Sequence, residues 1–324
     1  MRSGLWLAGL LLTGAASAAS GEGQRAALAA ERIARDAQPS RSDALPHRGL
    51  DAALAAHPDV SLQAGDVLLL RGPDLISAAI SQMGAQPSFF SHMAIVGLDP
   101  LWDSLEIVEA GAAEGVRIQL LDEWLQRDFV RFLVLRHADA DVARAAAIAA
   151  WRDAAAPSGS ARVYDFALAL DDRSRLYCTE LIRHAYAAAD PAAAPVPPDA
   201  ALSSVNGLRD TLPLSALGVV NDTVFLPDDL ELDPRFSPVL ELRRTDLLPA
   251  AATLDHWFHT LFTDLRGEAR QARLQAIEDA VPRGPVIVPY LLRDNLRAYL
   301  QLPEAARAPL AGLALLAESA LSPD

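Results

Sequence analysis

Residues 176–183 read LYCTELIR and contain the single cysteine of the chain, Cys178. A polar turn precedes this stretch, and the apolar residues that follow recur at the spacing of one helix face, so Cys178 is expected at or near a helix N-terminus. Unpaired backbone N–H groups and the helix dipole stabilise a thiolate there, and the thiolate is the nucleophilic form of cysteine. A lone buried cysteine is also a common small hydrophobic residue of protein cores. The sequence therefore makes Cys178 a candidate nucleophile, with a structural thiol as the alternative.

The first 18 residues have the pattern of a secretory signal peptide. Arg2 precedes an apolar run over residues 5–12, and small residues follow at 16–18. We expect cleavage near Ala18, a periplasmic or secreted protein, and no transmembrane segment in the mature chain. Paired cysteines are normally oxidised in that environment, so an unpaired cysteine there is either tolerated or used.

The composition narrows the range of partners. The formal net charge is −14, from 42 acidic and 28 basic residues, and every basic residue is an arginine. Such an acidic chain is not expected to bind nucleic acid or an anionic membrane by bulk electrostatics. Its 324 residues are enough for one large domain with an appendage.

The strongest strand signals lie before the cysteine. The run 66–71 is almost continuously apolar and bounded by glycines, which is typical of a buried strand. The runs 91–97 and 105–110 are joined by a short connection and predict an antiparallel hairpin. Further predicted elements are helices over 24–37, 74–80 and 140–155, a strand over 129–136, and extended segments over 219–226 and 239–243.

The register of the predicted hairpin decides which polar side chains meet. With Val96 opposite Leu105, His92 lies opposite Glu109 on the same face of the sheet, because side chains alternate along each strand. The Cβ atoms of directly opposed residues are about 5 Å apart, so the carboxylate can orient the imidazole. By the same alternation Glu106 points to the other face.

These residues complete a chemical requirement. A cysteine nucleophile needs a base that holds it as thiolate, and the base needs a third group that orients it. We predict that Cys178, His92 and Glu109 fill these three roles, with no metal and no cofactor. His137, at the end of a predicted strand, is the main rival base. The remaining histidines are interpreted as structural or as lying outside the core: His47, His57, His184, His256 and His259.

Taken in order, these motifs resemble the permuted papain-like amidases of the YiiX and YebB type, circularly permuted relatives of the NlpC-type cell-wall peptidases. The residues that carry the resemblance are Gly65-Asp66, 91–96 (SHMAIV), 108–110 (VEA), 164–166 (YDF) and 177–181 (YCTEL). Unpermuted relatives have the cysteine before the histidine, so the reversed order here is informative. The resemblance covers about residues 65–189 and implies the same three catalytic residues. The family usually has serine after the cysteine, where this chain has Thr179, which keeps the hydroxyl.

The predicted fold class is α+β: a circularly permuted papain-like fold with an antiparallel sheet packed against helices and a mainly helical C-terminal extension. The predicted organisation is a signal peptide (1–18), an N-terminal helical arm (19–64), a catalytic core (65–190), a linker and extended segment (191–246) and the helical extension (247–324).

Other polar and aromatic residues near the motifs have predicted roles. Tyr164 is expected either to donate a hydrogen bond to the oxyanion or to be an ordinary core tyrosine. Phe89 and Phe90 are expected to line a substrate groove or to anchor their loop in the core. Two acidic residues are expected to pair with nearby arginines: Asp165 and Glu180, with Arg175 or Arg183.

The predicted function is an exported cysteine hydrolase that cleaves an amide bond, in a peptide or cell-wall-related substrate, through a thioester. One alternative keeps the site but acts on lipid acyl esters, as a hydrolase or acyltransferase, since relatives in the same permuted group that resemble lecithin retinol acyltransferase do so. A hydrophobic groove around Phe89 and Phe90 would favour that alternative. A second alternative is an inactive binding module on the same fold. The predicted partner is an amide- or ester-containing substrate and not nucleic acid.

Overall fold

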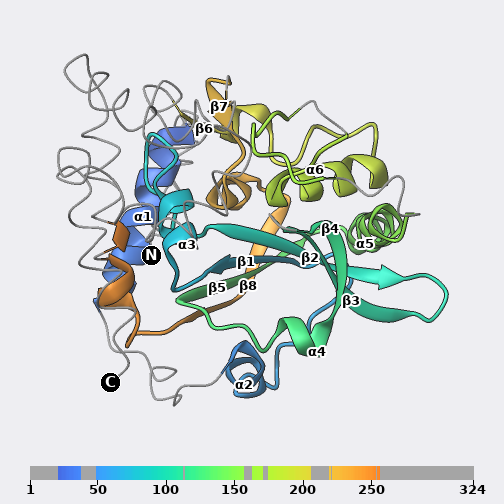
Figure 1. Ribbon diagram of the computed structural model, residues 1–324, viewed down its shortest axis with the longest axis horizontal. Coiled ribbons are helices and arrows are strands. Elements are labelled where there is room, and N and C mark those ends of the chain that lie inside the picture. The colour runs from blue at the N-terminus through green and yellow to red at the C-terminus, as the bar shows by residue number, and fades with distance from the viewer. Residues whose placement is uncertain are drawn as a thin grey trace, which may run out of the picture.

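The fold is built on one six-stranded antiparallel sheet with the strand order β4-β3-β2-β1-β5-β8 (Figure 1). The computed structural model describes residues 21–37, 49–111, 114–156, 163–170, 174–205, 219, 221–252 and 254–255. The strands of the sheet are β1 (Val67–Arg71), β2 (His92–Asp99), β3 (Ser104–Gly111), β4 (Gly115–Leu120), β5 (Arg131–His137) and β8 (Phe236–Arg243).

Helices cover both faces of the sheet (Figure 1). On one face, α5 (Ala140–Ala154) and α6 (Cys178–Ala189) pack on a core that includes Leu69, Met93 and Ile95. On the other face, α2 (Leu50–Ala55) and α4 (Leu121–Trp124) pack on a second core. This α+β architecture agrees with the predicted fold class.

The central strand shows why both faces need cover. All five residues of β1 are buried, and they alternate between the two cores. Val67 and Leu69 face α5 and α6, whereas Leu68 and Leu70 face the opposite core. A strand that is buried on both sides reads as a continuous apolar run, so the sequence prediction for 66–71 is confirmed.

The predicted hairpin forms, but its register was wrong by two residues. Val96 pairs with Ile107 and not with Leu105, and Ala94 is the residue opposite Glu109. Both strands run further than predicted, up to the pair Asp99 and Ser104, because the Asp99 side chain accepts the backbone N–H of residue 101 at 2.7 Å and closes the turn. A shift of two residues keeps every side chain on its predicted face, because side chains alternate with a period of two.

Several helices agree with the sequence pattern, and some elements were missed. The predicted helices correspond to α1 (Gly21–Asp36), α3 (Leu75–Ser81) and α5, and Asp74 caps α3 by accepting from the Ser77 N–H at 2.9 Å. No prediction was made for α2 or β4. The sheet also extends past the predicted core boundary at residue 190, because β8 pairs with β5 along its whole length. Smaller elements are β6 (Ser203–Ser204), β7 (Thr223–Val224) and the 3-10 helices η2 (Asp199–Ala201) and η3 (Pro227–Leu232).

Helix α1 is a packing arm held by ion pairs. Arg25 binds Asp229 at 2.9 Å, and Arg32 binds Glu231 at 2.7 Å and Glu241 at 3.0 Å. Arg32 is only 2% exposed, and a charge buried in this way needs a partner. Glu231 and Glu241 provide the compensating charge. Within the described residues, no helix has the length and apolar character needed to cross a membrane.

Candidate active site

Cys178 is the first residue of α6 and is 5% exposed. The prediction that it lies at a helix N-terminus is therefore confirmed. The residues on either side attach this end of the helix to Phe225. The Thr179 hydroxyl donates to the Phe225 carbonyl at 2.7 Å, and the Phe225 N–H donates to the Tyr177 hydroxyl at 3.3 Å. The two residues that flank the sulfur are therefore fixed to Phe225, and the sulfur lies in the first turn of a helix, where backbone N–H groups have no partner within the helix.

His92 begins β2 and contacts Glu109 of β3 directly. Its Nε2 lies 2.8 Å from Glu109 Oε2, although the two residues are diagonal and not directly opposed in the sheet. The His92 side chain is 22% exposed and that of Glu109 is 1% exposed. Because Glu109 holds Nε2, Nδ1 is the ring nitrogen that remains for proton exchange with a nucleophile.

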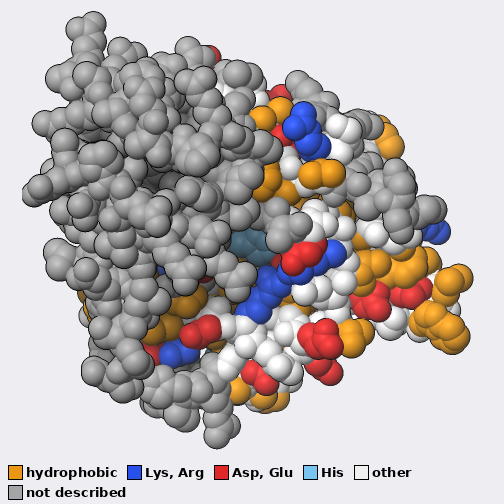
Figure 2. All heavy atoms as spheres, in the orientation of Figure 1, with side chains coloured by type: hydrophobic (Ala, Val, Ile, Leu, Met, Phe, Trp, Pro, Cys, Tyr) orange, Lys and Arg blue, Asp and Glu red, His pale blue; other side chains and the backbone are white. Residues whose placement is uncertain are grey.

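The carboxylate of Glu109 is the centre of a hydrogen-bond cluster. Besides His92 its donors are Arg117 (Nε at 3.1 Å, Nη2 at 2.7 Å), Trp124 (Nε1 at 2.9 Å) and Arg127 (Nη1 at 2.9 Å, Nη2 at 2.6 Å). Arg127 also stacks over the Trp124 ring at 5.0 Å. Figure 2 shows arginine and acidic side chains next to one another near the middle of the visible face. The cluster keeps a buried carboxylate charged, because every donor stabilises the anion.

The pKa shifts of the pair follow from these contacts. Burial would raise the pKa of Glu109, but the hydrogen bonds and charges of His92 and Arg127 hold it well below its usual range. Burial would likewise lower the pKa of His92, but interactions with Cys178 and Glu109 raise it to about 10. At neutral pH, Glu109 is therefore an anion and His92 an imidazolium.

Cys178 and His92 come together where their two elements begin. Cys178 interacts with the His92 ring, since hydrogen bonding and charge at Cys178 both contribute to the raised pKa of His92. The arrangement of the ring, with one side on Glu109 and the other on Cys178, is that of a nucleophile, base and orienting residue.

Tyr164 lies close to the same sulfur. Burial raises the pKa of Tyr164 well above its usual value, and the charge of Cys178 raises it further. Its ring also packs against Phe166, with the ring centroids 4.9 Å apart. A tyrosine in this environment keeps its O–H proton and can donate it in a hydrogen bond.

Phe90 does not have the predicted position in a groove. It is 0% exposed, and the Arg32 guanidinium lies 4.9 Å from the centre of its ring. Phe89 is half-buried between Arg32 at 5.2 Å and Arg131 at 5.1 Å. Both rings therefore anchor their loop beneath the arm α1, which was the alternative interpretation.

The predicted arginine partners of Asp165 and Glu180 were wrong. Asp165 accepts the backbone N–H groups of Ala167 at 2.9 Å and Ala169 at 2.5 Å. Glu180 lies 3.5 Å from His184 on the same helix, and burial raises its pKa. Arg183, the nearer predicted partner of Glu180, binds Asp199 instead, at 2.5 Å.

The rival histidines take no part in the cluster. His137 is 9% exposed, its Nδ1 accepts the Asp139 N–H at 3.1 Å, and its ring packs against Tyr186 and Phe236. This surrounding identifies His137 as structural. His47, His256 and His259 lie outside the described residues, as does the predicted signal peptide. Among the described residues, no three His, Cys, Asp or Glu side chains gather as metal ligands.

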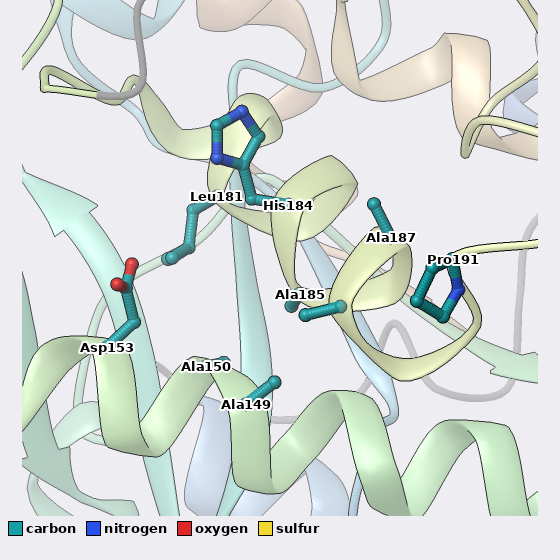
Figure 3. A pocket seen from close by; sticks show the side chains of 9 residues that line it. Ala149, Ala150, Asp153, Leu181, His184, Ala185, Ala187 and Pro191 are labelled. Carbon is teal, nitrogen blue, oxygen red and sulfur yellow. The ribbon is translucent and has the colours of Figure 1, made fainter.

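A separate groove of about 360 Å³ lies between α5 and α6 (Figure 3). Its lining is mainly alanine and leucine, with Asp153 and His184 as its ionisable side chains. The side chains of Cys178, His92 and Glu109 do not line it. The groove is therefore distinct from the candidate active site.

Trp124 provides a test of the hydrogen-bond cluster. Trp124→Phe keeps a ring beneath Arg127 and beside Phe132 but removes the N–H donor to Glu109. We expect a loss of about 2 kcal/mol in the free energy of unfolding, typical of a hydrogen bond to a charged group, measured by urea denaturation. Trp151→Phe is the matched comparison, because it removes the same kind of bond outside the Glu109 cluster, the one from Trp151 Nε1 to Glu106 at 2.6 Å. An unchanged stability of Trp124→Phe would contradict a structural role for this bond.

Comparisons with known proteins agree with the sequence resemblance. Residues 61–197 match the family of permuted papain-like amidase enzymes named YaeF/YiiX, the C92 peptidase family. A solved structure that is similar is that of the metalloprotein YiiX from Escherichia coli O157:H7, with 19% identity and a TM-score of 0.41 over 56% of this chain and 98% of that chain. No curated protein matches the chain significantly. The family match confirms the predicted resemblance and the permuted papain-like fold class for residues 61–197, and it supports a hydrolase of the amidase or peptidase class. The predicted helical extension lies outside the described residues from residue 256 onward.

Proposed function

We propose that this chain, whose residues 61–197 match the permuted papain-like amidases, is an exported cysteine hydrolase that cleaves an amide bond with Cys178, His92 and Glu109. The observation that carries the proposal is that two side chains, Glu109 and Cys178, interact with the imidazole of His92. Glu109 binds Nε2 of His92, while Cys178 faces the same ring from the start of α6. The export part of the proposal rests on the signal-peptide pattern of residues 1–18.

The first half of the reaction forms a thioester. The Cys178 thiolate attacks the amide carbonyl carbon, and the negative charge moves to the carbonyl oxygen. Backbone N–H groups at the start of α6 and the Tyr164 hydroxyl are the donors for this oxyanion. The tetrahedral intermediate collapses, the C–N bond breaks, and the imidazolium of His92 gives its proton to the leaving amine.

The second half releases the acid. Neutral His92 takes a proton from a water molecule, whose oxygen attacks the thioester carbonyl carbon. Collapse of this intermediate breaks the C–S bond, frees the carboxylic acid and returns Cys178 as thiolate beside protonated His92. Glu109 keeps the ring oriented in both halves and remains an anion throughout.

The groove that would have favoured action on lipid acyl esters is not present at Phe89 and Phe90. A groove around Phe89 and Phe90 would have held an acyl chain, but Phe90 is fully buried and both rings lie beneath Arg32. An amide-containing substrate is therefore the better proposal, with peptides, including cell-wall peptides, as its first class.

Trapping the thioester tests the reaction. The full chain is mixed with peptide p-nitroanilides or with phosphatidylcholine vesicles, quenched in acid within seconds and analysed by intact-protein and peptide mass spectrometry. We expect an acyl adduct on Cys178 from the peptide substrates and none in Cys178→Ala. An adduct from phosphatidylcholine alone would support the lipid alternative. If neither reagent is turned over or forms an adduct, while Cys178 is alkylated only after denaturation, the chain is a binding module.

A further inference from the structure

Cys178 begins α6 and His92 begins β2, and these two elements are distant in sequence. The distance between the two side chains must therefore depend on a further part of the chain that contacts both. Residues 225–231, which we name the bridging segment, contact both elements and lie outside the family match of 61–197. At one end, Phe225 binds the start of α6 through the hydroxyl groups of Thr179 and Tyr177. This contact involves the two residues that flank the nucleophile.

Three residues later the bridging segment binds the loop that leads to the base. Asp228 accepts the backbone N–H groups of Phe89 at 2.7 Å and Phe90 at 3.1 Å, and also the hydroxyl of Ser88. Ser91 follows and joins the sheet through its N–H, which donates to the Leu70 carbonyl at 2.9 Å. The next residue is His92, so the carboxylate of Asp228 holds the last turn of chain before the base.

The arm α1 fixes the bridging segment from outside. Arg25 binds Asp229, and Arg32 binds Glu231 while stacking on Phe89 and Phe90. The bridging segment therefore cannot shift without breaking ion pairs with α1, and the loop of residues 88–90 is held between Asp228 and Arg32. Both contacts of the bridging segment belong to one short stretch of chain, which gives a stiff connection between α6 and β2.

We propose that Asp228 is a positioning residue, which acts through residues 88–91 to place His92 against Cys178. The bridging segment is then the spacer between base and nucleophile. This inference rests on the proposed roles of Cys178 and His92. It predicts that loss of Asp228 weakens the contact between these two residues before it unfolds the protein.

The test is the rate at which iodoacetamide alkylates Cys178 in the folded full chain at pH 7 and pH 9. In the wild type the pKa of His92 is about 10, so its positive charge lies beside the reacting sulfur at both values and the two rates should agree within about twofold. Asp228→Ala should lower the rate at pH 7 about tenfold and change that at pH 9 little, because hydroxide in the solvent can then take the place of a displaced His92. Asp228→Asn keeps one acceptor oxygen for the loop, so its alkylation rate at pH 7 should lie between those of the wild type and Asp228→Ala.

Matched variants separate positioning from stability. Asp233→Ala removes a carboxylate that is 1% exposed and binds Arg235, outside the bridging segment. It should lower the melting temperature and leave the ratio of the two rates unchanged. If it changes the ratio as much as Asp228→Ala, or if folded Asp228→Ala keeps the wild-type ratio, the proposal is wrong.

Milder variants keep the test informative if Asp228→Ala does not fold. Ser88→Ala removes one donor to Asp228, and Thr179→Val removes the hydroxyl that holds Phe225; each should lower the pH 7 rate about threefold. Thr179→Ser retains the hydroxyl and should keep the wild-type ratio. If the ratio of the pH 7 rate to the pH 9 rate is the same in Ser88→Ala, Thr179→Val and Thr179→Ser, the proposal is wrong. His92→Asn distinguishes the underlying function: if it too leaves the ratio unchanged, the Cys178–His92 pair fails, and the role of Asp228 fails with it.

Discussion

Glu109→Gln should lower the kcat/KM of amide hydrolysis about 10,000-fold, the scale seen when the orienting acid of a catalytic triad becomes an amide. The carboxylate can only accept hydrogen bonds, so at the His92 ring it requires an N–H at Nε2 and leaves Nδ1 for proton exchange with the nucleophile. A glutamine can present its NH₂ group to the ring instead and so favours the wrong tautomer. The measurement is hydrolysis of the peptide p-nitroanilide that gives the Cys178 adduct.

The same variant should also destabilise the protein. It removes the counter-charge of Arg127 and leaves Arg117 with Glu114 alone, at 3.2 Å. Breaking a buried ion pair costs about 3–5 kcal/mol. Each arginine side chain is 29% exposed and can be partly rehydrated, so we expect a loss near the lower limit. Urea denaturation at pH 7 measures it.

Glu106→Gln is the matched control, because Glu106 lies on the same strand and faces the other side of the sheet, where Trp151 is its partner. It should leave kcat/KM within about threefold of wild type, since Glu106 does not contact the His92 ring. If Glu109→Gln keeps kcat/KM within tenfold of wild type, the orienting role is wrong.

The stability from Glu109 should also depend on pH with a defined sign. Its pKa in the folded protein is below the value of about 4.3 in unfolded chains. The contribution is therefore fully present above the unfolded pKa and is lost as the pH falls below it. The difference in stability between wild type and Glu109→Gln should shrink from pH 6 to pH 3.

Local pattern was sufficient for much of the fold and for the candidate triad. The apolar run of β1, the hairpin and the helix start at Cys178 each depend on neighbours in sequence, which periodicity records. Glu109 remained on the face of His92 because the register error was an even number of residues. An error of one residue would have exchanged Glu109 with Val108 or Ala110.

The partners of Glu109 could not be predicted in the same way. Arg117 lies directly opposite Glu109 in the sheet, but that pairing is visible only once β4 is recognised as the next strand. Trp124 and Arg127 approach from α4 and the loop after it, and no local pattern reports such a distant contact. The sequence left open whether Phe90 lines a groove or anchors its loop for a related reason, since the arginine that covers it belongs to α1.

His92→Asn should reduce kcat/KM about 10⁵- to 10⁶-fold, as large a loss as removal of Cys178, because residues of a catalytic unit act together. Asparagine neither accepts the thiol proton nor protonates the leaving amine. Alkylation of Cys178 by iodoacetamide at pH 7 should fall at least tenfold in this variant, since the nucleophile then has no base beside it. His137→Asn is the control, because His137 is packed between Tyr186 and Phe236 away from the cluster. It should lose stability and keep the pH 7 alkylation rate of the folded protein.

The raised pKa of His92 determines how the difference in stability between wild type and His92→Asn varies with pH. Its pKa is about 10 in the folded protein, above the usual value of 6.5, because Cys178 and Glu109 outweigh burial. The stabilisation from its charge is therefore complete below pH 6.5, declines as the pH rises, and is lost above about 10. Glu109 and Cys178 both raise the pKa of the His92 ring. The positive charges of Arg117 and Arg127 are neutralised in part by Glu109. Urea denaturation of wild type and His92→Asn should consequently give the largest difference at pH 6 and a small one at pH 10. A difference that grows with pH would mean that His92 is neutral in the folded protein, and the thiolate would then need another source of stabilisation than this ring.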